Sequence, residues 1–271
     1  ELLLLLLFLV AEMQKKNPPP YVPGMDAAGI VDQVGQDVTT GVKVGDRVMA
    51  MVVPRAAHGA YREQIVLDQR AVVPAPAGSS HVEACTLPMN ALTARMSLDL
   101  LDLKPGEVIA VTGGPGAYGG YVIQLAKADG LKVIADGADS DRALLKSLGA
   151  DIIVSRGDGF ADKIREHFPQ GVDGLADGAL LNALAVDAVK DGGSFTAIRG
   201  FKGKDQRGIK FTATWVTGYD GAYEKLDLLR EQVEAGVLTL RVAGSVTPED
   251  AGHAHQRLEQ GGTRGRMVIE F

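Results

Sequence analysis

A repeated order of strand, turn and helix from Lys104 onward constrains the fold of this chain more than any other feature. Apolar, β-rich runs of four to eight residues alternate there with amphipathic helical patterns. Parallel strands need a crossover of this kind between them. We therefore expect an α/β fold with a doubly wound parallel sheet of about six strands, at Val108–Thr112, Lys132–Ala135, Asp151–Val154, Val172–Ala176, Ser194–Ile198 and Ile209–Val216.

Periodic apolar patterns also predict the helices, at Tyr118–Ala128, Ser140–Leu148, Phe160–His167, Leu180–Val189, Ala222–Ala235 and Pro248–Gln260. The chain before Pro76 differs, because short β-rich runs are separated there by Gly, Pro and Asp. This pattern indicates a small β-domain, with strands expected at Ala28–Val34, Arg47–Val53 and Tyr61–Leu67. A last strand is expected at Arg266–Phe271.

The turn after the first strand of the large sheet reads GGPGAYGG, which contains GxGxxG between a strand and a helix. This context is typical of a Rossmann dinucleotide-binding domain. We expect Gly114 to permit the tight turn, Gly116 to let the backbone approach a pyrophosphate, and Gly119 to let the helix pack on the strand. The first amides of that helix, at Ala117 and Tyr118, would then face the anion.

An acidic residue follows at the end of the second strand. Asp136 stands 17 residues after the last glycine of the motif, where a dinucleotide fold places the carboxylate that binds the adenosine ribose. A 2′-phosphate would meet Asp136, Asp139 and Asp141, with Arg142 as the nearby cation in sequence, so these residues favour NADH over NADPH. The aspartates could instead stabilise the start of the next helix. A glycine turn with an acidic residue could also bind the adenosine of S-adenosylmethionine in a methyltransferase.

Composition excludes several classes of partner. The 271 residues are 46% hydrophobic, enough for two packed domains, and their formal net charge of −6 is spread over interspersed charges. Without a basic stripe, we expect neither nucleic acid nor a membrane as a partner. Cys85 is the one cysteine, which excludes an internal disulfide and a zinc site of several thiolates and favours a cytoplasmic location.

The chain begins with Glu1 and the unbroken apolar run Leu2–Val10. Nine residues are too few to span a bilayer, and no basic segment precedes them as it would in a secretory signal. We therefore expect a buried strand or helix of a domain whose beginning is missing or altered.

Three stretches resemble the medium-chain dehydrogenase/reductase superfamily. VPGMDAAGIVDQVGQDVTTGVKVGDRVMA (Val22–Ala50) is similar to its GroES-like catalytic domain, whereas Leu87–Lys127 and the ending GGTRGRMVIEF resemble the zinc-independent quinone oxidoreductase, or zeta-crystallin-like, branch. The resemblance implies an incomplete GroES-like domain at residues 1–87, a Rossmann domain at 88–220 and a return to the catalytic domain at 221–271.

The resemblance also implies an activity, namely hydride transfer from NAD(P)H to a quinone or an activated enone. It points to NADPH, against the narrow preference for NADH that Asp136 suggests. It further implies a homodimer, which the apolar strand Ile209–Val216 could form by pairing across a two-fold axis. Zinc-dependent members carry a His-Glu pair within GHExxG, where this chain has Gly24-Met25-Asp26. Methionine is not a usual zinc ligand, so we expect no metal.

Further candidate site residues follow from the resemblance and from the strand ends. Similar proteins bring a threonine to the nicotinamide, and Thr93 is that residue here. Gly178, Arg199 and Gly200 follow the fourth and fifth strands, at the edge where an open parallel sheet binds its ligand. Arg264 and Arg266 in the tail are candidate phosphate contacts, with ordinary surface arginines as the alternative.

A catalytic acid is not evident in the sequence. The candidates are His58 and Tyr61, because the family places their segment near the cleft and His58 could donate a proton near neutral pH. An exposed loop histidine and a core tyrosine are the simpler explanations. The alternatives that stay open are a non-catalytic NAD(P)-binding protein, and an alcohol dehydrogenase or methyltransferase on a similar Rossmann domain.

Overall fold

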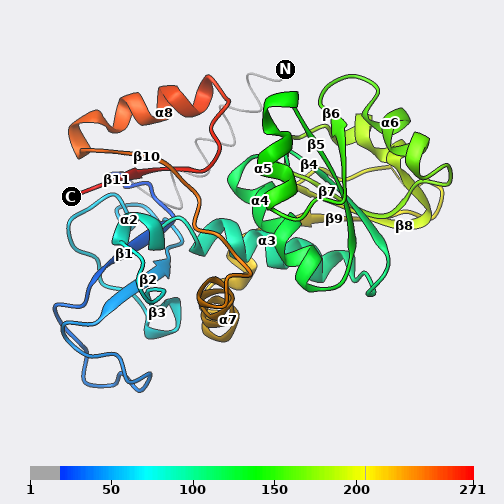
Figure 1. The fold of residues 1–271 in the computed structure, drawn as a ribbon. Helices are drawn as coiled ribbons and strands as arrows, with labels where there is room; N and C mark the ends of the chain where they lie inside the picture. Colours follow the sequence, from blue (N-terminus) through cyan, green and yellow to red (C-terminus); the bar gives the residue numbers. More distant parts are fainter. Residues whose placement is uncertain (1–18, 205) are drawn as a thin grey trace.

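The computed structural model describes residues 19–204 and 206–271, so the apolar run Leu2–Val10 lies outside the described residues. Two bodies lie side by side in Figure 1, a large sheet flanked by helices and a smaller body that contains two short sheets. The long helix α3 (Pro88–Leu101) leads from the smaller body into the larger one. The last part of the chain returns to the smaller body, which is therefore built from segments far apart in sequence.

The large sheet confirms the expected doubly wound fold. Its six strands are parallel and lie in the order β6-β5-β4-β7-β8-β9. The order reverses between β4 and β7, and ligands of such sheets bind outside the carboxyl ends of the strands at this reversal. The strands are β4 (Val108–Thr112), β5 (Lys132–Gly137), β6 (Ile152–Ser155), β7 (Val172–Asp177), β8 (Val189–Ile198) and β9 (Lys210–Thr214).

Helices cover both faces of this sheet, as buried parallel strands require. On one face α3 and α4 (Ala117–Ala128) pack over the fully buried Ile109 and Val111. On the other face α6 (Phe160–His167) packs over Ala110. Within residues 19–204 and 206–271, none of the helices combines the length and hydropathy needed to cross a bilayer.

The smaller body joins early and late segments of the chain. One of its sheets is antiparallel and the other consists of two parallel strands. Its parts are β1 (Asp26–Ile30), β2 (Arg47–Met51), β3 (Val72–Pro74), α2 (His81–Ala84), β10 (Val242–Val246), α8 (Ala251–Glu259) and β11 (Arg266–Ile269), while α7 (Tyr223–Glu234) packs between this body and α3.

The expected strand Tyr61–Leu67 is wrong. The segment is irregular, and the third strand of the antiparallel sheet is β3 instead. A strand needs a neighbour to complete its backbone hydrogen bonds. No other strand of the described chain pairs with this segment, and the Val66 side chain is 89% exposed.

The expected helix Leu180–Val189 is also wrong in type. The structure has the 3₁₀ helix η3 (Asn182–Ala188), because Leu180 (φ 59°) and Asn182 (φ 52°) adopt left-handed backbone conformations that an α-helix cannot contain. The Asp177 carboxylate accepts the backbone N–H groups of Leu181 and Asn182, which fixes this turn at the end of β7.

Candidate functional site

The GxGxxG turn lies at the carboxyl end of β4, where the strand order reverses. Gly113 adopts the left-handed conformation (φ 68°), so the tight turn expected at Gly114 is made one residue earlier, because the chain reverses directly after the strand. Gly114 is required by space, since a Cβ there would lie 2.8 Å from Cδ2 of Leu145. A Cβ on Gly119 would lie 2.3 Å from the carbonyl oxygen of Gly113, so only glycine lets α4 approach this closely.

The amino end of α4 offers a site for an anion. Gly116 is the N-cap and no side chain caps the helix. Intrahelical bonding starts with the amide of Gly120, which donates to the carbonyl of Gly116. The amides of Ala117, Tyr118 and Gly119 therefore have no intrahelical partner. Together with the helix dipole they favour a phosphate group.

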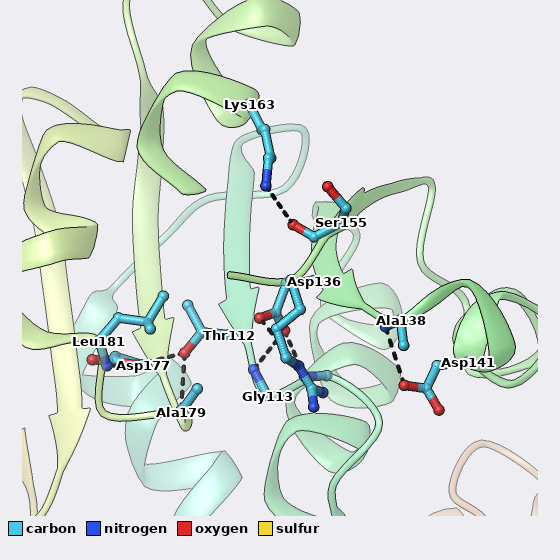
Figure 2. Close-up of polar contacts among 12 residues, drawn as sticks. Thr112, Gly113, Asp136, Ala138, Asp141, Ser155, Lys163, Asp177, Ala179 and Leu181 are labelled. Carbon is cyan, nitrogen blue, oxygen red and sulfur yellow. Dashed lines mark hydrogen bonds and ion pairs between the residues drawn. The ribbon is translucent and has the colours of Figure 1, made fainter. Parts of the chain in front are cut away.

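Asp136 lies beside this turn, at the end of β5. Its Oδ1 accepts hydrogen bonds from the amides of Gly113 (2.7 Å) and Gly114 (3.3 Å), and Figure 2 shows the carboxylate directed at the turn. Its Oδ2 is buried and has no hydrogen-bond partner. Burial raises the pKa of this carboxyl, whose side chain is 1% exposed. One unpaired acceptor thus remains where a ribose hydroxyl would donate.

A cleft of about 420 Å³ opens over the turn. This volume lies within the range of small-molecule sites. Thr263 in its lining carries a second buried oxygen, Oγ1, without a hydrogen-bond partner. The lining residues come from the ends of β4 to β7 and from the C-terminal tail, and they are Gly113, Gly116, Asp136, Arg156, Gly157, Gly178, Ala179, Leu181, Gly262, Thr263 and Arg264.

Two arginines border the cleft. Arg156 follows β6 and its Nε lies 3.9 Å from Oδ2 of Asp136. Arg264 comes from the tail and binds both carboxylate oxygens of Asp141, at 2.6 and 2.9 Å. The cleft therefore presents both a carboxylate and cations within one site.

Arg142, the cation expected near Asp136, lies elsewhere. Its Nε binds Asp139 at 3.1 Å, its side chain is half-exposed, and it does not line the cleft. Arg156 takes that place because the parallel neighbour β6 ends beside β5 and brings its next residue to the same edge. The cation next to Asp136 is thus distant from it in sequence.

A hydrogen-bond network fixes the wall of the cleft that follows β7 (Figure 2). The hydroxyl of Thr112 donates to Oδ1 of the fully buried Asp177 at 2.5 Å and accepts from the amide of Ala179 at 3.0 Å. The same carboxylate accepts from the amide of Leu181. The lining residues Ala179 and Leu181 are thereby tied to the end of β4.

Gly178 completes this wall and contacts the glycine turn. A Cβ on Gly178 would lie 2.6 Å from Cδ1 of Tyr118, so the aromatic ring packs directly on its backbone. The Tyr118 hydroxyl lies 2.7 Å from Oγ of Ser97 inside the core. The Tyr118 side chain therefore packs against this wall from the side of the core.

Of the candidates, Gly114, Ala117, Tyr118 and Gly119 belong to the turn but not to the lining of the cleft, and Thr93, Arg199 and Gly200 also lie outside the lining. The Thr93 hydroxyl donates to the carbonyl of Met89 within α3, at 2.6 Å. Arg199 (φ 59°) and Gly200 (φ 80°) form the left-handed turn after β8, and Gly200 packs against the ring of Trp215. Their contact with a cofactor stays a prediction.

The two candidate acids have other partners. Nε2 of His58 lies 3.0 Å from the carbonyl oxygen of Val66, and the Tyr61 hydroxyl lies 3.2 Å from Nε2 of His255. Neither residue lines the cleft. A catalytic role for either stays a prediction.

Both bodies match known families. Residues 7–77 match the alcohol dehydrogenase GroES-like domain, and residues 117–218 match the zinc-binding dehydrogenase family. The chain thus carries both domains of the medium-chain dehydrogenase/reductase fold. The expected resemblance and the α/β fold with its GroES-like part are therefore confirmed.

Relatives within the superfamily include reductases of enones and quinones. The 2-methylene-furan-3-one reductase of Solanum lycopersicum is 31% identical over 93% of this chain and 64% of the relative. The chloroplastic NADPH-dependent alkenal/one oxidoreductase of Arabidopsis thaliana is 31% identical over 68% of this chain and 48% of the relative. A quinone oxidoreductase from Pseudomonas syringae pv. tomato superimposes with a TM-score of 0.82 at 25% identity, covering 94% of this chain and 84% of that structure. The chain thus spans less than two thirds of these two curated relatives.

The second matched family is named for zinc. No group of three potential ligands among His, Cys, Asp and Glu occurs in the part of the chain that the structure describes. Met25 packs against the core, and the Asp26 carboxylate is bound by Arg266 and by the amide of Met89.

Two residues of the site escaped the sequence analysis. Arg156 could have been found by applying the strand-end rule to the third strand, as was done for the second, fourth and fifth. Arg241 lies behind the glycine turn and donates to the carbonyl of Pro115. No local pattern marks it, because it approaches from a segment more than one hundred residues away.

Proposed function

We propose that this chain reduces a quinone or an activated enone with hydride from NAD(P)H. The printed names of the relatives support this activity, since they include enone and quinone oxidoreductases. The observation that carries the proposal is the cleft, which combines free helix amides, an unpaired carboxylate oxygen and two arginines around a glycine turn.

These residues fit a nicotinamide dinucleotide. When bound, such a cofactor supplies the hydride. The amides of Ala117 and Tyr118 would hold the diphosphate, and Oδ2 of Asp136 would accept from the ribose hydroxyls. The wall after β7 would exclude water from the side of the nicotinamide.

The choice between the two cofactors depends on opposing charges. At an effective dielectric near 20, repulsion between the Asp136 carboxylate and a 2′-phosphate costs on the order of a few kcal/mol before screening. Arg156 offsets part of this repulsion, since its Nε is 3.9 Å from the same carboxylate. We therefore propose a modest preference for NADH, although the Arabidopsis relative is named for NADPH.

The reaction proceeds without zinc in this proposal. Met25 and the fully engaged Asp26 support it, because neither presents a free ligand atom of the usual kind. The same proposal includes a cytoplasmic location and a homodimer paired through β9, the edge strand of the large sheet.

Turnover assays test the activity. Loss of nicotinamide absorbance should be seen when NADH or NADPH is mixed with the chain and a panel of naphthoquinones and α,β-unsaturated ketones. Chelator should leave the rate unchanged. Cofactor binding without oxidation across the panel would indicate the non-catalytic alternative, and turnover of S-adenosylmethionine would indicate a methyltransferase.

A further inference from the structure

Arg241 is a buried cation beside the glycine turn. Arg241 is 6% exposed and lies in the segment that joins α7 to β10. Its Nη2 donates to the carbonyl oxygens of Pro115 (2.9 Å) and Arg264 (3.0 Å), and its Nη1 has no hydrogen-bond partner. Burial lowers the pKa of Arg241, and no carboxylate pairs with it in residues 19–204 and 206–271. A buried charge of this kind is strongly disfavoured unless something compensates it.

The helix makes room for this guanidinium. A Cβ on Gly120 would lie 1.9 Å from Nη1 of Arg241, so the guanidinium keeps this position only while residue 120 is glycine. Glycine inside a helix is itself unfavourable relative to alanine. Both the glycine and the buried arginine thus weaken the fold locally, and both lie at the amino end of the same helix.

The charge lies directly behind the proposed diphosphate site. The carbonyl that Arg241 binds belongs to the peptide between Pro115 and Gly116, and Gly116 is the N-cap of α4. Gly116, the N-cap of that helix, lines the cleft, whereas Arg241 is absent from its lining. An anion held by the free amides of this helix end would lie at the same turn whose Pro115 carbonyl Arg241 binds.

We propose that Arg241 is the buried counter-charge of the dinucleotide diphosphate, acting through the glycine turn without touching the cofactor. The inference rests on the proposed function, because it requires a diphosphate at the amino end of α4. It assigns Arg241 as a positioning residue for cofactor binding and explains why its Nη1 is left unpaired in the fold.

Calorimetric titration with ADP-ribose and with adenosine separates the contribution of the diphosphate charge to affinity from that of the adenosine, since only the first ligand carries the diphosphate. Arg241→Met should weaken ADP-ribose about tenfold and leave adenosine unchanged, whereas Arg241→Lys should recover most of the loss. Arg165→Met is the matched control, because Arg165 also binds two backbone carbonyls but extends from the far end of α6. It should change neither affinity.

A second variant and a second measurement keep the test decisive if Arg241→Met folds poorly. Gly120→Ala should displace the guanidinium, whose end is flexible, and weaken ADP-ribose likewise. Without ligand, the Tm of Arg241→Met should be no lower than that of the wild type. ADP-ribose should raise the Tm of the variant less than it raises that of the wild type.

Equal weakening of ADP-ribose and adenosine, or no weakening of either, overturns the inference and leaves the proposed function standing. Failure of the wild-type chain to bind ADP-ribose, NADH and NADPH overturns the proposed function and this inference with it.

Discussion

The Asp136 carboxylate accepts a 2.7 Å hydrogen bond from the amide of Gly113 with one oxygen and leaves the other oxygen buried and unpaired. The first oxygen holds the glycine turn, and the second is free for a ligand. Burial raises the pKa of this carboxyl, so the ionised form weakens the fold. The protonated carboxyl contributes its full stabilisation at pH values below its pKa in the unfolded chain. This contribution is lost as the pH rises through its higher pKa in the folded chain.

Asp136→Asn should therefore stabilise the ligand-free chain at neutral pH while weakening its binding of NADH. The amide keeps an oxygen for Gly113 but removes the buried charge, so we expect the free energy of unfolding in urea to rise by about 1 kcal/mol. The gain should shrink toward acidic pH, where the wild-type carboxyl is neutral as well. A variant that is less stable at neutral pH would show that the carboxylate is needed for the turn itself.

The ion pair between Asp26 and Arg266 joins β1 to β11 at 2.7 Å, with the aspartate side chain only 6% exposed. Asp26→Ala leaves the arginine unpaired and the amide of Met89 without its acceptor. We expect a loss of about 3 kcal/mol in urea unfolding. Asp68→Ala, which removes an exposed pair with Arg70, is the control and should cost far less. Similar losses for both variants would contradict the role of burial.

Cys85 should be inert in the folded chain. Burial, followed by the charge of Asp26, raises the pKa of its thiol to about 12. Only the thiolate reacts with iodoacetamide, so labelling at mildly alkaline pH should be slow in the native chain and fast in denaturant. Rapid native labelling, measured by mass spectrometry, would reveal a reactive thiol.

The edge strand β9 should pair with a second copy. The strand ends the large sheet, and an unpaired edge is a template for another strand. Light scattering at micromolar concentration should give twice the chain mass of 28.5 kDa. A monomer at that concentration would contradict pairing through this edge.

The periodic parts of the fold could be predicted from the sequence because their signals are local. All six strands of the large sheet and the helices Ala117–Ala128 and Phe160–His167 follow from the alternation of apolar runs with helical patterns. The predictions fail where the backbone conformation depends on contacts with other segments of the chain. Tyr61–Leu67 has the composition of a strand but no strand beside it. Leu180 and Asn182 adopt left-handed backbone conformations at a turn that is held by a hydrogen bond from the Asn182 amide to the Asp177 carboxylate.

The site was predicted to a similar extent and for the same reason. The glycine turn and Asp136 are recognisable by spacing, and the structure places them together. Arg156 follows the third strand and could have been found by the strand-end rule, whereas Arg241 comes from a distant segment that no local pattern connects to the motif. Arg142, which is close in sequence, is directed to Asp139 instead.

Calorimetric titration of the wild-type chain with NADH and NADPH tests the central claim most directly. Both cofactors should bind, with NADH tighter by less than about tenfold. Asp136→Ser should weaken NADH and strengthen NADPH, Arg156→Ala should weaken NADPH more than NADH, and Arg142→Ala should change neither. Absence of binding for both cofactors, or wild-type binding of NADPH tenfold tighter than NADH, would contradict the account.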